Sequence, residues 1–361
     1  MNPKYGVSRR SFLRSAPVGV GAGIVGFAAE SSASDSPERR PAASRLPREV
    51  WIASISQNGM AADSHKGMIQ QMLARMNEVT TYQPDIICLP EVFPFVNLAG
   101  GRPKVSDAAE EPIGPITAPF AEFARKHKCY VICPTYTKHA GHCYNSAVFI
   151  DRQGKLLGEY RKMHPTVGEM DNGVTPGPLQ PPVFQTDFGV VGAQICFDIE
   201  WTDGWTALRK AGAEIVFWPS AFGGGSVVNG KAWQNKYCVV SSTRKGVTKI
   251  CDVSGEQLAW TGHWDRWVCA AVNLEKAFLH TWPFCNRFPE IHRKYGRKVR
   301  ITTFHEEEWS ILESRSPEVR IADVLAEFEL EPYWDFINTA EQVQNQRRPK
   351  RGGSPFLRQS G

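Results

Sequence analysis

From residue 48 onward, short apolar runs rich in β-branched residues alternate with longer segments whose apolar residues recur every three or four positions. The short runs predict strands and the longer segments predict helices. The predicted strands cover 49–57, 85–90, 130–136, 144–151, 155–162, 214–220 and 266–274, with a pair of strands in 183–196 and a hairpin over 247–260. The predicted helices cover 64–82, 116–128, 203–213, 229–243 and 316–330. This order predicts a mixed sheet flanked by helices.

The first 33 residues have a different character. Arg9 and Arg10 precede a Gly-rich apolar stretch, and small residues follow it in "SSAS". This pattern predicts a twin-arginine export signal, cleaved near Ala33, and a periplasmic or other extracytoplasmic location. The alternative is a retained N-terminal anchor, but the apolar stretch is shorter than the ~20 residues needed to span a bilayer. We therefore expect membrane contact only during transit.

Changes in composition along the rest of the chain predict its domain organisation. We expect a polar linker over 34–47 and the main domain over 48–300. We expect a more polar extension with one helix over 301–342, and a basic, disordered tail over 343–361.

The formal net charge is +5, and the basic residues cluster at the two ends of the chain. No continuous basic stripe follows, so we do not expect nucleic-acid binding. The nine cysteines mostly lie in apolar runs, which predicts buried free thiols. Metal binding within 129–143 is an alternative, although the spacing of its cysteines and histidines fits no standard zinc pattern. The glycine-rich stretch 222–226 lacks the Lys-Ser/Thr of a phosphate loop.

Three predicted strands lead into a reactive side chain. Glu91 follows "DIICLP", Lys162 closes "GEYRK", and Cys196 ends "VGAQIC". Taken singly, each residue also fits an ordinary structural role, as a loop carboxylate, a surface lysine and a packing thiol.

Together these segments resemble the nitrilase, or carbon–nitrogen hydrolase, superfamily. The resemblance covers roughly 48–300 and includes "LPE", "YNSAVFIDRQG" leading into "YRKMHPTVGE", and "GVVGAQICFD" followed by "GAEIVFWPSA". It implies a four-layer αββα sandwich, a homodimer or higher homo-oligomer, and no cofactor or metal.

The resemblance also implies a role for each site residue. Glu91 would be the general base and acid, Lys162 the cation that stabilises the oxyanion, and Cys196 the nucleophile. Glu169 would support them, and the backbone N–H of Phe197 would be a second oxyanion donor. Trp201 and Phe222 are candidates for the walls of the substrate pocket.

The chemistry explains this choice of residues. An amide carbon is a poor electrophile and requires a strong nucleophile, but a free thiol has a pKa of about 8.5. Glu91 would accept the thiol proton, and the positive field of Lys162 would favour the thiolate.

The sequence "CFD" at the nucleophile, together with His164, resembles the amidase and carbamoylase branches. We therefore expect hydrolysis of a small linear amide or an N-carbamoyl amine. Nitrile hydrolysis and a non-catalytic binding protein that retains the fold stay as alternatives. A cysteine peptidase of another fold would need a Cys–His pair, for which no segment offers the surrounding pattern.

Overall fold

The computed structural model describes residues 46–262 and 264–349. The predicted export signal, nearly all of the predicted linker and the end of the predicted tail lie outside the described residues.

Two six-stranded sheets form the centre of the fold. The first has the order β12–β1–β2–β3–β4–β5, with β12 Trp267–Asn273, β1 Glu49–Ile55, β2 Ile86–Cys88, β3 Tyr130–His139, β4 His142–Ile150 and β5 Leu156–Arg161. The second has the order β11–β10–β9–β8–β7–β6, with β11 Gln257–Trp260, β10 Lys249–Cys251, β9 Cys238–Thr243, β8 Ile215–Ser220, β7 Val190–Ala193 and β6 Val183–Gln185.

Each sheet has three neighbouring parallel strands, and antiparallel strands complete it. In the first sheet, Ile87 pairs with Ala53 on β1 and Val131 on β3. In the second, Val216 pairs with Gly192 on β7 and Val239 on β9. Parallel strands are usually buried on both faces, which explains the nearly unbroken apolar runs in the sequence.

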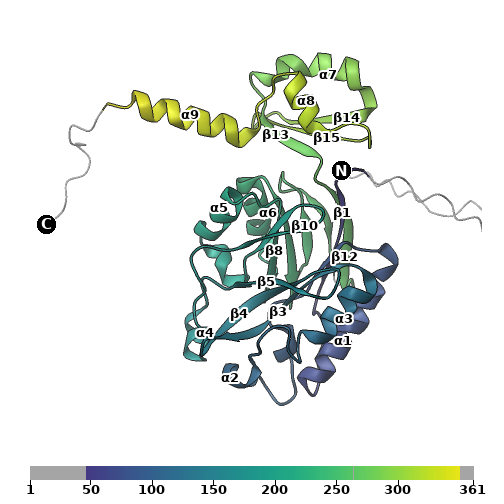
Figure 1. The fold of residues 1–361 in the computed structure, drawn as a ribbon, viewed down its shortest axis with the longest axis vertical. Helices are drawn as coiled ribbons and strands as arrows, with labels where there is room; N and C mark the ends of the chain where they lie inside the picture. The colour runs from purple at the N-terminus through teal and green to yellow at the C-terminus, as the bar shows by residue number, and fades with distance from the viewer. Residues whose placement is uncertain (1–45, 263, 350–361) are drawn as a thin grey trace, which may run out of the picture. The chain divides into compact units, whose positions relative to one another are not determined.

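Helices cover the outer face of each sheet (Figure 1). Helices α1 (His65–Glu78) and α3 (Ala118–His127) pack on the first sheet, and α5 (Asp203–Lys210) and α6 (Gly225–Asn235) pack on the second. The shorter helices of this region are α2 Val105–Ala108, α4 Val167–Asp171, η1 Thr80–Tyr82, η2 Phe93–Phe95 and η3 Cys196–Glu200.

Alternation along the strands divides the core into three layers of side chains. Ile52 and Phe217 belong to the cluster between the two sheets, whereas Ala53 packs with α1 and α3, and Val216 packs with α5 and α6. The αββα sandwich expected from the sequence is confirmed by this arrangement.

The prediction of one helix in 301–342 was wrong. The segment after the sandwich contains a three-stranded antiparallel sheet of β13, β15 and β14, which crosses the boundary predicted at residue 300. Its elements are β13 Lys276–His280, η4 Phe284–Arg287, α7 Phe288–Tyr295, η5 Gly296–Lys298, β14 Val299–Phe304, β15 Trp309–Ser314, α8 Ile321–Glu327 and α9 Tyr333–Arg347. Leu279, Leu312 and Val324 lie in a separate buried cluster. On the other face of this sheet, Phe278 and Ile311 belong to the buried cluster that includes Ile52 and Phe217.

The predicted helix over 229–243 was also wrong in its second half. Helix α6 ends at Asn235, and β9 starts at Cys238. Lys236 stops the helix in a left-handed conformation with φ of 61°. Glycine usually occupies this position, so the sequence carried no clear stop signal.

The nine cysteines are unpaired, and six of them are buried. No helix within the described ranges is long and apolar enough to cross a membrane.

Candidate active site

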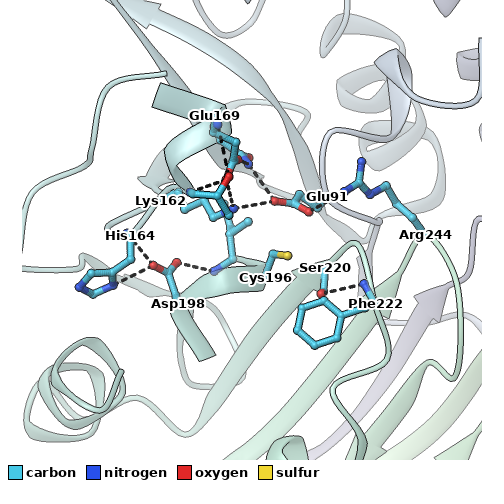
Figure 2. A network of polar contacts seen from close by, with 12 residues as sticks. Glu91, Lys162, His164, Glu169, Cys196, Asp198, Ser220, Phe222 and Arg244 are labelled. Carbon is cyan, nitrogen blue, oxygen red and sulfur yellow. Dashed lines mark hydrogen bonds and ion pairs between the residues drawn. The ribbon is translucent and has the colours of Figure 1, made fainter. Parts of the chain in front are cut away.

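The three sequence-predicted reactive residues come together from both sheets (Figure 2). Glu91 follows β2 and Lys162 follows β5 in the first sheet, whereas Cys196 follows β7 in the second and starts η3. All three are buried, with exposed fractions of 2%, 1% and 8%. A reaction at this point would therefore take place largely out of water.

Lys162 connects the two glutamates that the sequence singled out. Its Nζ lies 2.9 Å from Oε1 of Glu91 and 2.7 Å from Oε2 of Glu169. An ammonium group has three N–H donors, so one remains for a substrate oxygen.

Asn145, which the sequence analysis did not predict as a site residue, donates hydrogen bonds to the same two carboxylates. Its Nδ2 donates to Oε1 of Glu91 at 2.9 Å and to Oε1 of Glu169 at 2.8 Å. Glu169 is fixed further by a capping box with Thr166 at the start of α4. The site therefore has both carboxylates in place before substrate binds.

The charges in the site keep Glu91 ionised and Lys162 protonated. Burial acts to raise the pKa of Glu91, but the positive charges of Lys162 and Arg244 outweigh it and leave that pKa lowered. Burial acts to lower the pKa of Lys162, but the carboxylates of Glu91 and Glu169 leave it raised. At neutral pH the pair is a carboxylate and an ammonium.

Lys162 favours the Cys196 thiolate, as expected, but burial opposes it. Burial, with Glu91 adding to it, raises the pKa of the Cys196 thiol to about 12, although Lys162 acts to lower it. The positive charge of Lys162 is already shared by two carboxylates, so too little of it remains to stabilise a buried anion. At neutral pH the side chain of Cys196 is therefore a neutral thiol.

The backbone at the site is unusual at two places. Cys196 has φ of 47°, and Val92, which directly follows Glu91, has φ of 38°. Left-handed conformations are uncommon for residues other than glycine and cluster at functional sites.

Asp198 fixes the segments that carry Lys162 and Cys196. Its Oδ2 accepts from the Ile195 N–H at 2.7 Å and from the Tyr160 hydroxyl at 2.7 Å. Its Oδ1 accepts from the His164 N–H at 2.8 Å and lies 3.0 Å from Nδ1 of His164. The hydrogen bond to Asp198 raises the pKa of His164. One buried carboxylate therefore ties the chain after Lys162 to the turn at Cys196.

Two indole groups hold the same turn from the second sheet and its helices. Nε1 of Trp218 donates to the carbonyl of Cys196, and Nε1 of Trp205 donates to that of Asp198, each at 3.0 Å.

The predicted pocket residues lie at the border of the site. Phe197 follows Cys196 and places its ring edge-on to Trp201, with 5.0 Å between centroids. Trp201 stacks on His164 at 4.3 Å and is 39% exposed. The N–H of Phe222 donates to Oγ of Ser220 at 3.1 Å. The oxyanion role of Phe197 and the substrate contacts of Trp201 and Phe222 stay predictions.

A cavity of about 770 Å³ opens beside Glu169 and includes Tyr136, Arg102 and Thr166 in its lining. Tyr136 is 1% exposed overall. Part of a small molecule would fit beside Glu169, whereas Glu91, Lys162 and Cys196 are not among the residues that line this cavity.

Sequence reasoning missed three contributors: Asn145, Arg244 and the bonding of Asp198. Asn145 stands in the quoted segment "YNSAVFID", where a polar residue within a buried strand is the available signal. No local pattern marks Arg244. In the part of the chain that the structure describes, no three His, Cys, Asp or Glu side chains gather in a way that would hold a metal ion.

Comparison with known proteins identifies the family of the chain. Residues 52–277 match the sequence profile of the carbon-nitrogen hydrolases. Beta-ureidopropionase of Arabidopsis thaliana is 30% identical over 192 residues, which are 49% of this chain and 47% of that protein. Deaminated glutathione amidase of Rattus norvegicus is 30% identical over 175 residues, 44% of this chain and 52% of that protein. The chain thus spans about half the length of these curated relatives.

Solved structures show the same fold. The amidase from Nesterenkonia sp. has a TM-score of 0.55 and 16% identity, over 62% of this chain and 90% of that one. Saccharomyces cerevisiae Nit3, a member of branch 10 of the nitrilase superfamily, has a TM-score of 0.55 and 20% identity, over 64% of this chain and 93% of that one. The profile match covers more than half of the chain, and the chain therefore belongs to the carbon–nitrogen hydrolase family.

Proposed function

We propose that the protein hydrolyses a carbon–nitrogen bond in a small linear amide or N-carbamoyl amine through an acyl-thioester on Cys196. The observation that carries the proposal is the position of Lys162, which contacts Glu91 and Glu169 at 2.9 and 2.7 Å beside the Cys196 thiol. Similarity to a beta-ureidopropionase and a deaminated glutathione amidase supports this class of substrate.

In the first step, Glu91 accepts the proton from Sγ of Cys196 while the sulfur attacks the carbonyl carbon. The electrons of the C=O bond move to oxygen, and the third N–H of Lys162 and the backbone N–H of Phe197 stabilise the oxyanion. Because burial raises the thiol pKa to about 12, a free thiolate is too costly at neutral pH. Proton transfer and C–S bond formation therefore coincide. Losing one oxyanion donor typically costs about 10²–10³ in rate.

In the second step, the oxyanion reforms the carbonyl and the C–N bond breaks. Protonated Glu91 gives its proton to the nitrogen, which leaves as ammonia or an amine. Water then attacks the thioester while Glu91 accepts a proton from it. The C–S bond breaks, Glu91 returns the proton to sulfur, and the acid leaves.

A release assay tests the proposal. Wild-type protein and the Cys196→Ser variant are incubated with panels of linear amides, N-carbamoyl amines and nitriles, and ammonia or amine is measured. We expect release from an amide or carbamoyl compound by the wild type alone. Mass spectrometry of quenched turnover should show an acyl group on Cys196. Release from nitriles alone would contradict the proposed substrate class, and binding with neither release nor acylation would indicate a binding protein.

A further inference from the structure

Arg244 is a charged contact of Glu91 that comes from the second sheet. It directly follows β9, and its backbone N–H donates to the carbonyl of Ser220 at the end of β8 at 2.9 Å. Its guanidinium NH2 group donates to Oε2 of Glu91 at 3.2 Å, across 153 positions in the sequence. The arginine side chain is 20% exposed and the glutamate side chain 3%. Figure 2 shows the guanidinium and Lys162 on different sides of the Glu91 carboxylate.

The donors around Glu91 distinguish its two oxygens. Oε1 already accepts from Lys162 and from Asn145, each at 2.9 Å. Oε2 accepts from Arg244 at 3.2 Å. A carboxylate oxygen has two lone pairs, so Oε1 is filled and Oε2 retains one. The oxygen free to accept the thiol proton is therefore the one that Arg244 holds.

We propose that Arg244 is a positioning residue that directs proton transfer to Oε2 of Glu91 and sets the pH at which Glu91 becomes a competent base. The proposal rests on the proposed function, since it concerns the same base. When Oε2 takes the proton, Arg244 faces a neutral acid, which favours return of that proton to the leaving nitrogen. Arg244 thus makes Glu91 a weaker base and a stronger acid.

The groups facing Glu91 come from every neighbouring element. Lys162 follows β5, Tyr136 is on β3, Cys196 starts η3, and Glu169 on α4 lies across Lys162. Lys162 is bound to two carboxylates, whereas the guanidinium of Arg244 forms an ion pair with Glu91 within the described ranges. Removing the charge of Arg244 should therefore raise the pKa of Glu91 while Lys162 keeps its contacts.

The test measures kcat/KM against pH for three variants. Arg244→Gln removes the charge and Arg244→Lys retains it. Lys245→Gln is the matched control, because it removes a positive charge from an exposed neighbouring residue. We expect the acidic limb of the profile to move upward by about one to two pH units in Arg244→Gln. It should stay within about 0.3 units of wild type in the lysine variant and the control.

A second measurement needs no substrate and separates this proposal from the proposed function. Alkylation of Cys196 by iodoacetamide is followed by mass spectrometry from pH 4 to 8. The low-pH fall in its rate, which follows protonation of Glu91, should shift upward in Arg244→Gln and in a second neutral variant, Arg244→Asn. An unshifted limb with a raised KM would overturn the proposal and make Arg244 a substrate-binding residue. A shift in alkylation without any C–N hydrolysis would support the role of Arg244 and count against the proposed function alone.

Discussion

The bonding of Asp198 makes a sharp prediction about stability and activity. Asp198 has no exposed surface, and each of its two oxygens has two polar contacts. In Asp198→Asn, one oxygen becomes an NH2 group of nearly the same size. If the NH2 replaces Oδ2, the hydrogen bonds from the Ile195 N–H and the Tyr160 hydroxyl are lost. If it replaces Oδ1, the bond from the His164 N–H is lost, and Nδ1 of His164 can keep its contact only as an acceptor.

The magnitude follows from these contacts. A hydrogen bond to a charged group contributes about 1.5–3 kcal/mol, and an unsatisfied buried donor costs about 1–3 kcal/mol. We therefore expect the free energy of unfolding to fall by roughly 3–5 kcal/mol. Turnover should fall by about 10²-fold or more, because Asp198 ties the segments of Lys162 and Cys196 together and small displacements of reacting groups are costly.

The size of the loss should depend on pH. The hydrogen bond to Asp198 raises the pKa of His164 in the folded protein. Protonated His164 therefore stabilises the folded protein. This contribution is complete below the pKa of histidine in the unfolded chain, about 6.5, and it is lost as pH rises through the pKa of His164 in the folded protein. The penalty of Asp198→Asn should therefore be larger at pH 6 than at pH 9.

Urea unfolding at both pH values, with turnover at neutral pH, measures these effects. Asp203→Asn is the matched control, because its Oδ2 lies 3.4 Å from Nε2 of the same histidine and its side chain is 51% exposed. That variant should lose less than about 0.5 kcal/mol. A loss below about 1 kcal/mol in Asp198→Asn, with turnover retained, would refute the assignment of Asp198 as the tie between the two segments.

Four further predictions concern the reaction, export and assembly. Cys196→Ser should fold with an unchanged circular dichroism spectrum but lose turnover to near background, and adding Lys162→Ala should lower the rate scarcely further, because the two act as one unit. Glu169→Gln should lower kcat less than Lys162→Ala does, because Lys162 keeps its contact with Glu91, which Asn145 also contacts. An equal loss of kcat would make Glu169 a direct participant in the reaction. Replacing Arg9 and Arg10 with lysine should leave the precursor in the cytoplasm, and a mature form outside would contradict twin-arginine export. Sedimentation at micromolar concentration should show a dimer or larger assembly, and a monomer alone would count against the predicted homo-oligomer.

Sequence reasoning could predict those site residues that lie in recognisable short segments. Glu91 and Cys196 each follow an apolar strand, Lys162 ends the segment "GEYRK", and the order of these segments made the resemblance specific. The unbroken apolar run in "EIVFWPS" also predicted that both faces of β8 are buried.

The remainder of the site depends on contacts between distant segments. Arg244 reaches Glu91 across 153 positions, and Asn145 reaches it across 54. Nothing beside Arg244 in the sequence distinguishes it from an ordinary loop arginine. The pKa of the Cys196 thiol also depends on the fold, because burial raises it and Lys162 acts to lower it.

The charges of the folded site explain why a neutral thiol suits this chemistry. Glu91 and Glu169 oppose Lys162 and Arg244, so the formal charges of these four groups cancel before substrate arrives. A thiolate formed by losing its proton to water would add an unmatched negative charge at a buried position. In the proposed mechanism, proton transfer to Glu91 moves the negative charge from its carboxylate to sulfur, and then to the substrate oxygen, with no change in the total. The site therefore needs a base held beside the thiol rather than a thiol acidified in advance.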